Sequence, residues 1–152
     1  VLLNIGIIRK FILPRIIQIF AGRNGAITKE TRTTKMGYEY RPDAVLYNLK
    51  RLNKKFPDKE IFITENGIAT DNDDERIEFV TTVLKDVHTF VSENSNVIGY
   101  LYWSLLDNFE WDLGYQMNFG LVNVDRDTYE RIPHKSAKWF GKISSSKILS
   151  IP

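Results

Sequence analysis

The sequence contains no cysteine and only two histidines among its 152 residues. The absence of cysteine excludes disulfides and thiolate metal sites. The two histidines, His88 and His134, are far apart in sequence and lack the short spacing that is typical of paired zinc ligands. We therefore expect no metal site and no cofactor.

An excess of one charge is also lacking, since 21 Lys and Arg stand against 19 Asp and Glu. A nucleic-acid-binding domain concentrates basic charge on one face, so no nucleic-acid partner is expected.

A long uncharged apolar run is absent as well. Residues 1–20 are apolar, but Arg9, Lys10 and Arg15 interrupt them, and a central Arg or Lys costs about 2.5–3.5 kcal/mol in a membrane span. The same charges do not fit a signal peptide. We expect no membrane contact and one or two buried strands within residues 1–20. A cytoplasmic location is slightly favoured. A basic amphipathic surface segment is the alternative.

What is present is an ordinary globular composition, with 43% hydrophobic and 26% charged residues. Apolar runs that are typical of strands alternate with helix-period patterns, which favours an α/β fold with a parallel sheet. The run at 97–106 is nearly continuous, as in a strand covered on both faces. The acidic residues at 71–74 are interpreted as a solvated helix start, since they lack the spacing of a calcium loop. The expected order is helix 43–56, strand 60–64, helix to about 93, strand from 97, hairpin 119–132, helix 136–143 and a tail over 144–152.

One carboxylate has no evident structural use. Glu65 ends the apolar run that starts at Ile61, and Asn66-Gly67 then predicts a turn. A desolvated charge at the end of a buried strand needs partners, and barrel enzymes place catalytic residues at strand ends. Glu65 is therefore the first candidate catalytic residue.

A second group of chemically active side chains follows the apolar run at 97–106. Carboxyl ends of neighbouring parallel strands meet at one edge, so these side chains should face Glu65. Aromatic rings stack on sugar rings, and carboxylates accept hydrogen bonds from paired hydroxyls, so a sugar cradle is predicted. The alternative is that the aromatic residues belong to the core and the acids to the surface. The group comprises Trp103, Asp107, Glu110 and Trp111.

These residues lie in two motifs. The stretch Ile63–Gly67, read Ile-Thr-Glu-Asn-Gly, resembles the nucleophile motif of family 1 glycoside hydrolases, the β-glucosidase family. The stretch 99–111, which contains Trp-Ser-Leu-Leu-Asp-Asn-Phe-Glu-Trp, resembles the second long motif of that family. Shorter matches at 114–125 and 131–138 follow in the expected order, and the two long motifs together are highly specific.

The resemblance implies a retaining β-glycosidase, with a β-glycoside as substrate. Glu65 would be the nucleophile, while Glu110 and Trp111 would bind sugar hydroxyls. Trp103 would stack beneath the sugar ring and Phe119 would wall the pocket. The family folds as a (β/α)₈ TIM barrel of about 250 residues, so this chain would be the incomplete C-terminal part of one.

The resemblance also suggests a substrate without phosphate. The phospho-sugar branch of the family tends to carry Ser, Lys and Tyr at the positions of Glu110, Met117 and Phe119. A carboxylate facing a phosphate dianion is repelled. We therefore expect non-phosphorylated β-glycosides in carbohydrate metabolism.

The organisation expected from the resemblance has three parts. Residues 1–35 form a divergent or non-homologous segment, residues 36–143 the C-terminal part of a glycosidase barrel, and residues 144–152 a tail. The acid/base motif Asn-Glu-Pro does not occur in the 152 residues. The chain is therefore expected to be inactive alone, to need the missing N-terminal barrel portion as a partner, and to be open to self-association. The alternative is a non-catalytic sugar-binding or interaction remnant.

Overall fold

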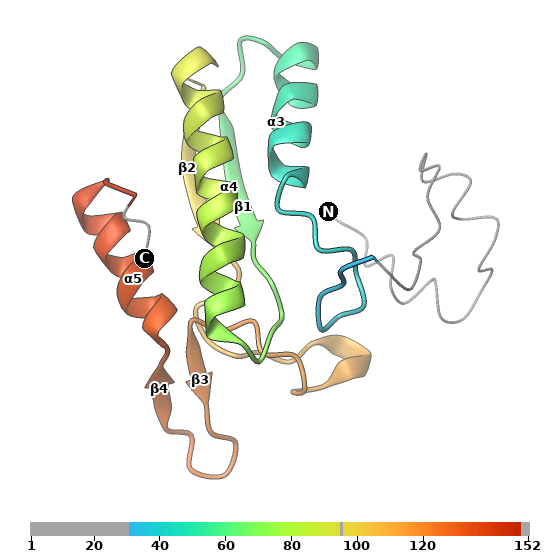
Figure 1. Cartoon of the computed structure of the whole chain (residues 1–152), viewed down its shortest axis with the longest axis vertical. Helices are drawn as coiled ribbons and strands as arrows, with labels where there is room; N and C mark the ends of the chain where they lie inside the picture. Colours follow the sequence, from blue (N-terminus) through green and yellow to red (C-terminus); the bar gives the residue numbers. More distant parts are fainter. Residues whose placement is uncertain (1–30, 95, 150–152) are drawn as a thin grey trace, which may run out of the picture. The chain divides into compact units, whose positions relative to one another are not determined.

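The computed structural model describes residues 31–94 and 96–149 of the chain (Figure 1). The chain divides into two compact units between Tyr40 and Arg41. In the described part of the first unit, Thr33 and Glu39 form an isolated antiparallel bridge, and the Arg32 guanidinium lies over the Tyr40 ring. The strands expected within 1–20 fall outside the described residues.

The second unit begins with a short helix, α3, at Ala44–Lys55. Its apolar residues recur at helical spacing, and Leu49 is buried. α3 packs against the long helix α4, Asp73–Asn94, and Asn53 donates a side-chain hydrogen bond to Asn94 at 2.8 Å. Both helices were predicted at these positions. The apolar side of α4 forms much of the core, whereas Leu49 is the buried residue that α3 contributes.

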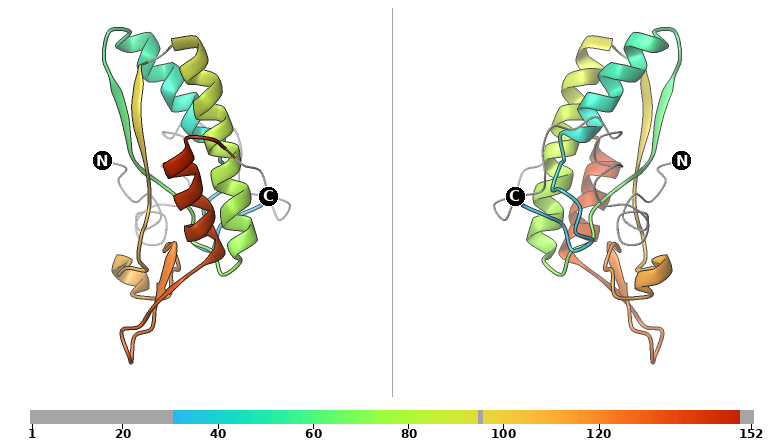
Figure 2. Two further views of the ribbon diagram at one scale, coloured as in Figure 1. Left: turned by 90° about the vertical axis from the view of Figure 1, so that its left-hand side faces the viewer. Right: turned by 90° about the vertical axis from the view of Figure 1, so that its right-hand side faces the viewer.

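A pair of parallel strands lies against these helices. β1, Ile61–Asn66, pairs with β2, Val97–Tyr102, in the register Ile61 to Val97 and Asn66 to Tyr102. The predicted parallel pairing is confirmed. Since α4 connects the two strands, this is a βαβ unit, and α3, α4 and α5 all lie on one side of it (Figure 2).

The expectation that residues 97–106 form a strand covered on both faces is wrong. The strand ends at Tyr102, and its Ile98 and Leu101 side chains are 60% and 50% exposed. The physical reason is that the helices of the described unit cover one face only (Figure 2).

The chain closes with a hairpin and a helix. β3, Val122–Val124, pairs antiparallel with β4, Arg131–Pro133, as predicted. Helix α5, Lys135–Ser146, extends past its predicted end at 143. It ends where Lys147 adopts the left-handed conformation and donates its N–H to the Ile143 carbonyl.

Within residues 31–94 and 96–149, none of the helices has both the length and the apolar character that crossing a membrane requires.

Candidate functional site

The carboxyl ends of β1 and β2 lie next to each other. The Trp103 N–H donates to the Asn66 carbonyl at 2.9 Å, immediately after the paired residues Asn66 and Tyr102. Tyr100 OH donates to Asn66 Oδ1 at 2.8 Å, so Asn66 is held through both its backbone and its side chain. Glu65 and Trp103 therefore leave the sheet at the same edge.

Close packing of the backbones supports this junction. A Cβ at Gly67 would collide with the Trp103 carbonyl, so only glycine lets the two chains approach this closely. Residues Trp103 and Ser104 are joined by a cis peptide bond.

The Glu65 carboxylate is exposed, and it has no hydrogen-bond or ion-pair partner among the described residues. The premise that a buried strand end desolvates this group is therefore wrong for this chain, since water reaches it. A free carboxylate at the sheet edge is available to an incoming molecule.

Asp107, by contrast, is buried at 7% exposure and has a structural role. Its Oδ1 accepts from the Gly120 N–H at 2.8 Å, and its own N–H donates to the Val122 carbonyl at 3.1 Å. A Cβ at Gly120 would collide with the Asp107 backbone. Asp107 thus connects the loop after β2 to the residues at the start of β3. The sequence motif did not indicate this structural role.

Glu110 and Trp111 lie on a tight turn. The Glu110 N–H donates to the Gly114 carbonyl at 2.6 Å, and a short 3₁₀ helix, η1, covers Trp111–Leu113. Trp111 has φ of 45°, a conformation that is costly for a large side chain, and it is 69% exposed. Burial raises the pKa of the half-buried Glu110 carboxyl.

The alternative that the aromatic residues of this motif belong to the core is wrong for the described structure. Trp103, Phe109 and Trp111 are 37%, 57% and 69% exposed. Exposed large aromatic rings that follow one another along a loop are typical of a contact surface.

Phe119 lies on the neighbouring segment and is half-buried. Its carbonyl accepts from Tyr102 OH at 2.9 Å, and burial raises the pKa of Tyr102 to about 12, so this hydroxyl stays a donor at neutral pH. The backbone of Phe119 is therefore attached to the end of β2, near the junction that carries Trp103.

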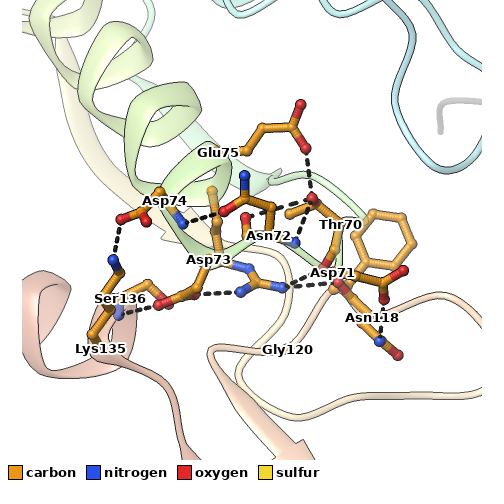
Figure 3. A network of polar contacts seen from close by, with 12 residues as sticks. Thr70, Asp71, Asn72, Asp73, Asp74, Glu75, Asn118, Gly120, Lys135 and Ser136 are labelled. Carbon is orange, nitrogen blue, oxygen red and sulfur yellow. Dashed lines mark hydrogen bonds and ion pairs between the residues drawn. The ribbon is translucent and has the colours of Figure 1, made fainter.

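A buried polar network centred on Arg76 holds the segment that precedes Phe119 (Figure 3). The Arg76 side chain is 1% exposed, and its Nη2 donates to the carbonyls of Thr70 and Asn118 at 3.1 and 3.0 Å. Its Nη1 pairs with Asp73 at 2.5 Å. The network joins the loop after β1 to the segment that precedes Phe119.

The interpretation of residues 71–74 as a solvated helix start is wrong for Asp73. Its carboxylate accepts from the Ser136 N–H and hydroxyl at 2.9 and 2.6 Å as well as from Arg76. Burial raises the pKa of Asp73, but these bonds outweigh it, and the net pKa lies below the ordinary value of 3.8. Local pattern could not reveal Ser136 as the partner, because it lies on another helix.

Among residues 31–94 and 96–149, no three His, Cys, Asp or Glu side chains gather as metal ligands would.

Comparison with known proteins agrees with the two motifs. The sequence model described as "Glycosyl hydrolase family 1" matches residues 18–148. The chain is 41% identical over 128 residues to a putative beta-glucosidase 15 of Oryza sativa subsp. japonica, covering 78% of this chain and 35% of that protein. It is 38% identical over 117 residues to a 6-phospho-beta-galactosidase of Streptococcus mutans, covering 71% of this chain and 25% of that protein.

A solved structure shows the same arrangement. The beta-glycosidase from Pyrococcus horikoshii superimposes with a TM-score of 0.76 at 40% identity, covering 85% of this chain and 30% of that one. The chain therefore spans about a third or less of the length of these relatives. With a family match over most of its residues and an α/β structure shared with a solved β-glycosidase, the chain belongs to glycosyl hydrolase family 1.

Proposed function

We propose that this chain is the C-terminal part of a (β/α)₈ barrel that hydrolyses β-glycosidic bonds with retention of configuration. The observation that carries the proposal is the meeting of Glu65 and Trp103 at one edge of a parallel βαβ unit. Catalytic groups of barrel enzymes come from the carboxyl ends of strands.

Glu65 is the proposed nucleophile. Its exposed carboxylate attacks the anomeric carbon, the bond to the leaving-group oxygen breaks, and that oxygen takes a proton from a separate acid. Water then hydrolyses the glycosyl ester of Glu65. Retention requires the two carboxyl groups to lie about 5–5.5 Å apart.

The sugar-binding contacts are assigned to the aromatic and acidic side chains around this edge. Trp103 stacks beneath the sugar ring, Glu110 and Trp111 bind its hydroxyls, and Phe119 walls the pocket. Two observations support these assignments. Both tryptophans are exposed, and the Phe119 carbonyl accepts a hydrogen bond from Tyr102 OH at the end of β2.

The proton donor and the rest of the barrel lie outside the 152 residues in this proposal. Asn-Glu-Pro is absent from the sequence, and the two parallel strands found among residues 31–94 and 96–149 cannot close a barrel. The isolated chain is then inactive and gains activity only with the remaining barrel portion.

The proposed substrate is a glycoside without phosphate. Glu110 is an acid and Met117 is apolar and buried, so neither supplies the cation that a phosphate dianion needs. Relatives of the chain include both a putative beta-glucosidase and a 6-phospho-beta-galactosidase, so the residues rather than the relatives favour this choice.

A co-expression experiment tests the proposal. The chain is produced with a polypeptide that supplies the remaining family 1 barrel, and an activated fluoroglucoside is used to trap the glycosyl enzyme. We expect a covalent sugar on Glu65 by mass spectrometry, none with Glu65→Gln, and faster hydrolysis of plain than of phosphorylated aryl β-glycosides. Labelling elsewhere, or preference for the phosphorylated substrate, contradicts the proposal.

The second candidate is a non-catalytic sugar-binding remnant, which the exposed Trp111 and the absent acid motif favour. Under this alternative the chain alone binds a β-glycoside, Glu65→Gln leaves that binding unchanged, and no combination of polypeptides hydrolyses the substrate.

A further inference from the structure

The segment from Asp107 to Tyr115, here called the aromatic loop, is contacted at both ends by one side chain from outside it. Arg126 Nη2 donates to the Asp107 carbonyl at 2.8 Å. The same guanidinium lies over the Tyr115 ring, with Cζ 4.1 Å from the ring centroid. A single planar group therefore joins the start of the loop to its end.

Within the aromatic loop, the Tyr115 ring that Arg126 contacts packs in turn against Phe109. Phe109 and Tyr115 meet edge to face with ring centroids 5.3 Å apart. Trp111, between them in sequence, has φ of 45°. A strained backbone persists only where its surroundings hold it in place. Hydrogen bonds within the turn, such as that from the Glu110 N–H to the Gly114 carbonyl, provide part of this support, and the contacts of Arg126 add support from outside the loop.

Arg126 itself projects from a fixed turn. Asp125 Oδ1 accepts hydrogen bonds from the Asp127 N–H at 2.9 Å and from the Thr128 N–H at 2.7 Å. The Asp125 N–H donates to the Glu130 carbonyl at 3.0 Å across the β3–β4 hairpin. Hydrogen bonds thus hold the turn of the hairpin from which the Arg126 side chain projects.

We propose that Arg126 is a positioning residue that clamps the aromatic loop and so fixes Glu110 and Trp111 for sugar binding. This inference rests on the proposed function for the sugar contact, but the clamp itself is measurable without sugar. The guanidinium is required because it donates a directed hydrogen bond and stacks on a ring at once, which an ammonium group does poorly.

The test uses the 152-residue chain with Arg126→Ala and Arg126→Lys. Arg131→Ala is the matched control, because Arg131 is an exposed arginine of the same hairpin that bonds the Tyr129 carbonyl rather than the loop. One readout is the indole N–H signal of Trp111 in a nitrogen–proton NMR spectrum, assigned with Trp111→Phe. The other is the affinity for methyl β-thioglucoside, which cannot be hydrolysed readily.

We expect both Arg126 variants to shift or broaden the Trp111 indole signal and to weaken sugar binding by about two- to tenfold. The indole signal of Trp139 on α5 serves as internal reference and stays unchanged, as do all signals and the affinity in Arg131→Ala. A merely structural loss of stability would move Trp139 as well.

The outcomes separate the two proposals. If the unaltered chain binds no sugar while Arg126→Ala still moves Trp111 alone, the clamp stands and the sugar site fails. If sugar binds but Trp111 and the affinity are the same in Arg126→Ala, the clamp is overturned. Should Arg126→Ala fail to fold, Tyr115→Leu removes the same stacking from the other side and must move Trp111, whereas Tyr115→Phe, which keeps the ring, must not.

Discussion

Asp73 and Asp74 are neighbours in sequence, but their carboxylates have opposite environments. Asp73 is 17% exposed and bonds Arg76, which is 1% exposed, together with Ser136 (Figure 3). Asp74 pairs with Lys135, and both side chains are more than half exposed. At the residue scale, burial rather than charge decides how much each carboxylate contributes to the stability of the fold.

Replacing Asp73 by Asn should lower the free energy of unfolding by about 3–5 kcal/mol, because the Arg76 charge would stay buried without its partner. Asp74→Asn is the matched control, and its exposed ion pair should be worth no more than about 1 kcal/mol. Urea unfolding at neutral pH measures both. Equal effects of the two substitutions would contradict the assigned role of Asp73.

The same residue predicts a pH dependence. The folded-state pKa of Asp73 lies below 3.8, the ordinary value. The stabilising contribution is therefore fully present above the unfolded-state pKa and is lost as the pH falls through 3.8 toward the folded-state value. Urea unfolding at a series of acidic pH values should show a steeper loss of stability for the unaltered chain than for Asp73→Asn.

At the scale of elements, the junction of β1 and β2 depends on one missing Cβ. Gly67→Ala should destabilise the chain by about 1–3 kcal/mol, because the methyl group would collide with the backbone carbonyl of Trp103. Gly141→Ala on α5 is the control. Its Cβ would meet no atom within 4 Å, and alanine favours a helix by about 0.5–1 kcal/mol. Denaturant titrations should show a lower free energy of unfolding for Gly67→Ala and a higher one for Gly141→Ala. An unchanged free energy of unfolding in Gly67→Ala would contradict the close packing of Gly67 against the Trp103 backbone.

The elements themselves could largely be predicted from periodicity. The apolar stripe predicted for α4 comprises Ile77, Val80, Leu84, Val87 and Val91. Ile77, Val80 and Val87 are buried, whereas Leu84 and Val91 are half-buried. The two apolar runs correctly predicted the parallel strands. Local pattern failed where a long-range partner decides the outcome, as for Asp107 with Gly120.

For the candidate site, the position of its residues at one sheet edge was predictable, whereas their roles stay a prediction. Sequence motifs identified Glu65 and Trp103, and pairing of the strands places them at one edge. The exposure of Glu65 was not predicted, because the apolar run before it is typical of a strand buried on both faces, whereas the carboxylate is exposed in this chain. Arg126 carries no signal in the sequence, since its two contacts depend on how the hairpin folds toward the loop.

At the scale of the whole molecule, the second unit leaves apolar side chains in water where a larger protein would bury them. These side chains belong to β1, β2 and the segment after β2, and each is about half exposed or more: Phe62, Ile98, Leu101 and Leu105. Exposed apolar side chains on and beside a two-stranded sheet mark an interaction surface or a risk of aggregation, and the outer edges of the two described parallel strands add to that risk.

We therefore predict that the 152-residue chain self-associates in a concentration-dependent way, as measured by size exclusion with light scattering. The double substitution Ile98→Thr and Leu101→Thr should shift it toward the monomer, because each change removes apolar surface that association would bury. Tyr129→Thr, at a side chain that is 65% exposed on the hairpin, should leave the association unchanged. Addition of the polypeptide that supplies the remaining barrel should replace self-association by a one-to-one complex, since both would compete for the same exposed strands. A cooperatively melting monomer at every concentration would mean that the exposed side chains need no partner, and the incomplete-barrel proposal would lose its physical basis.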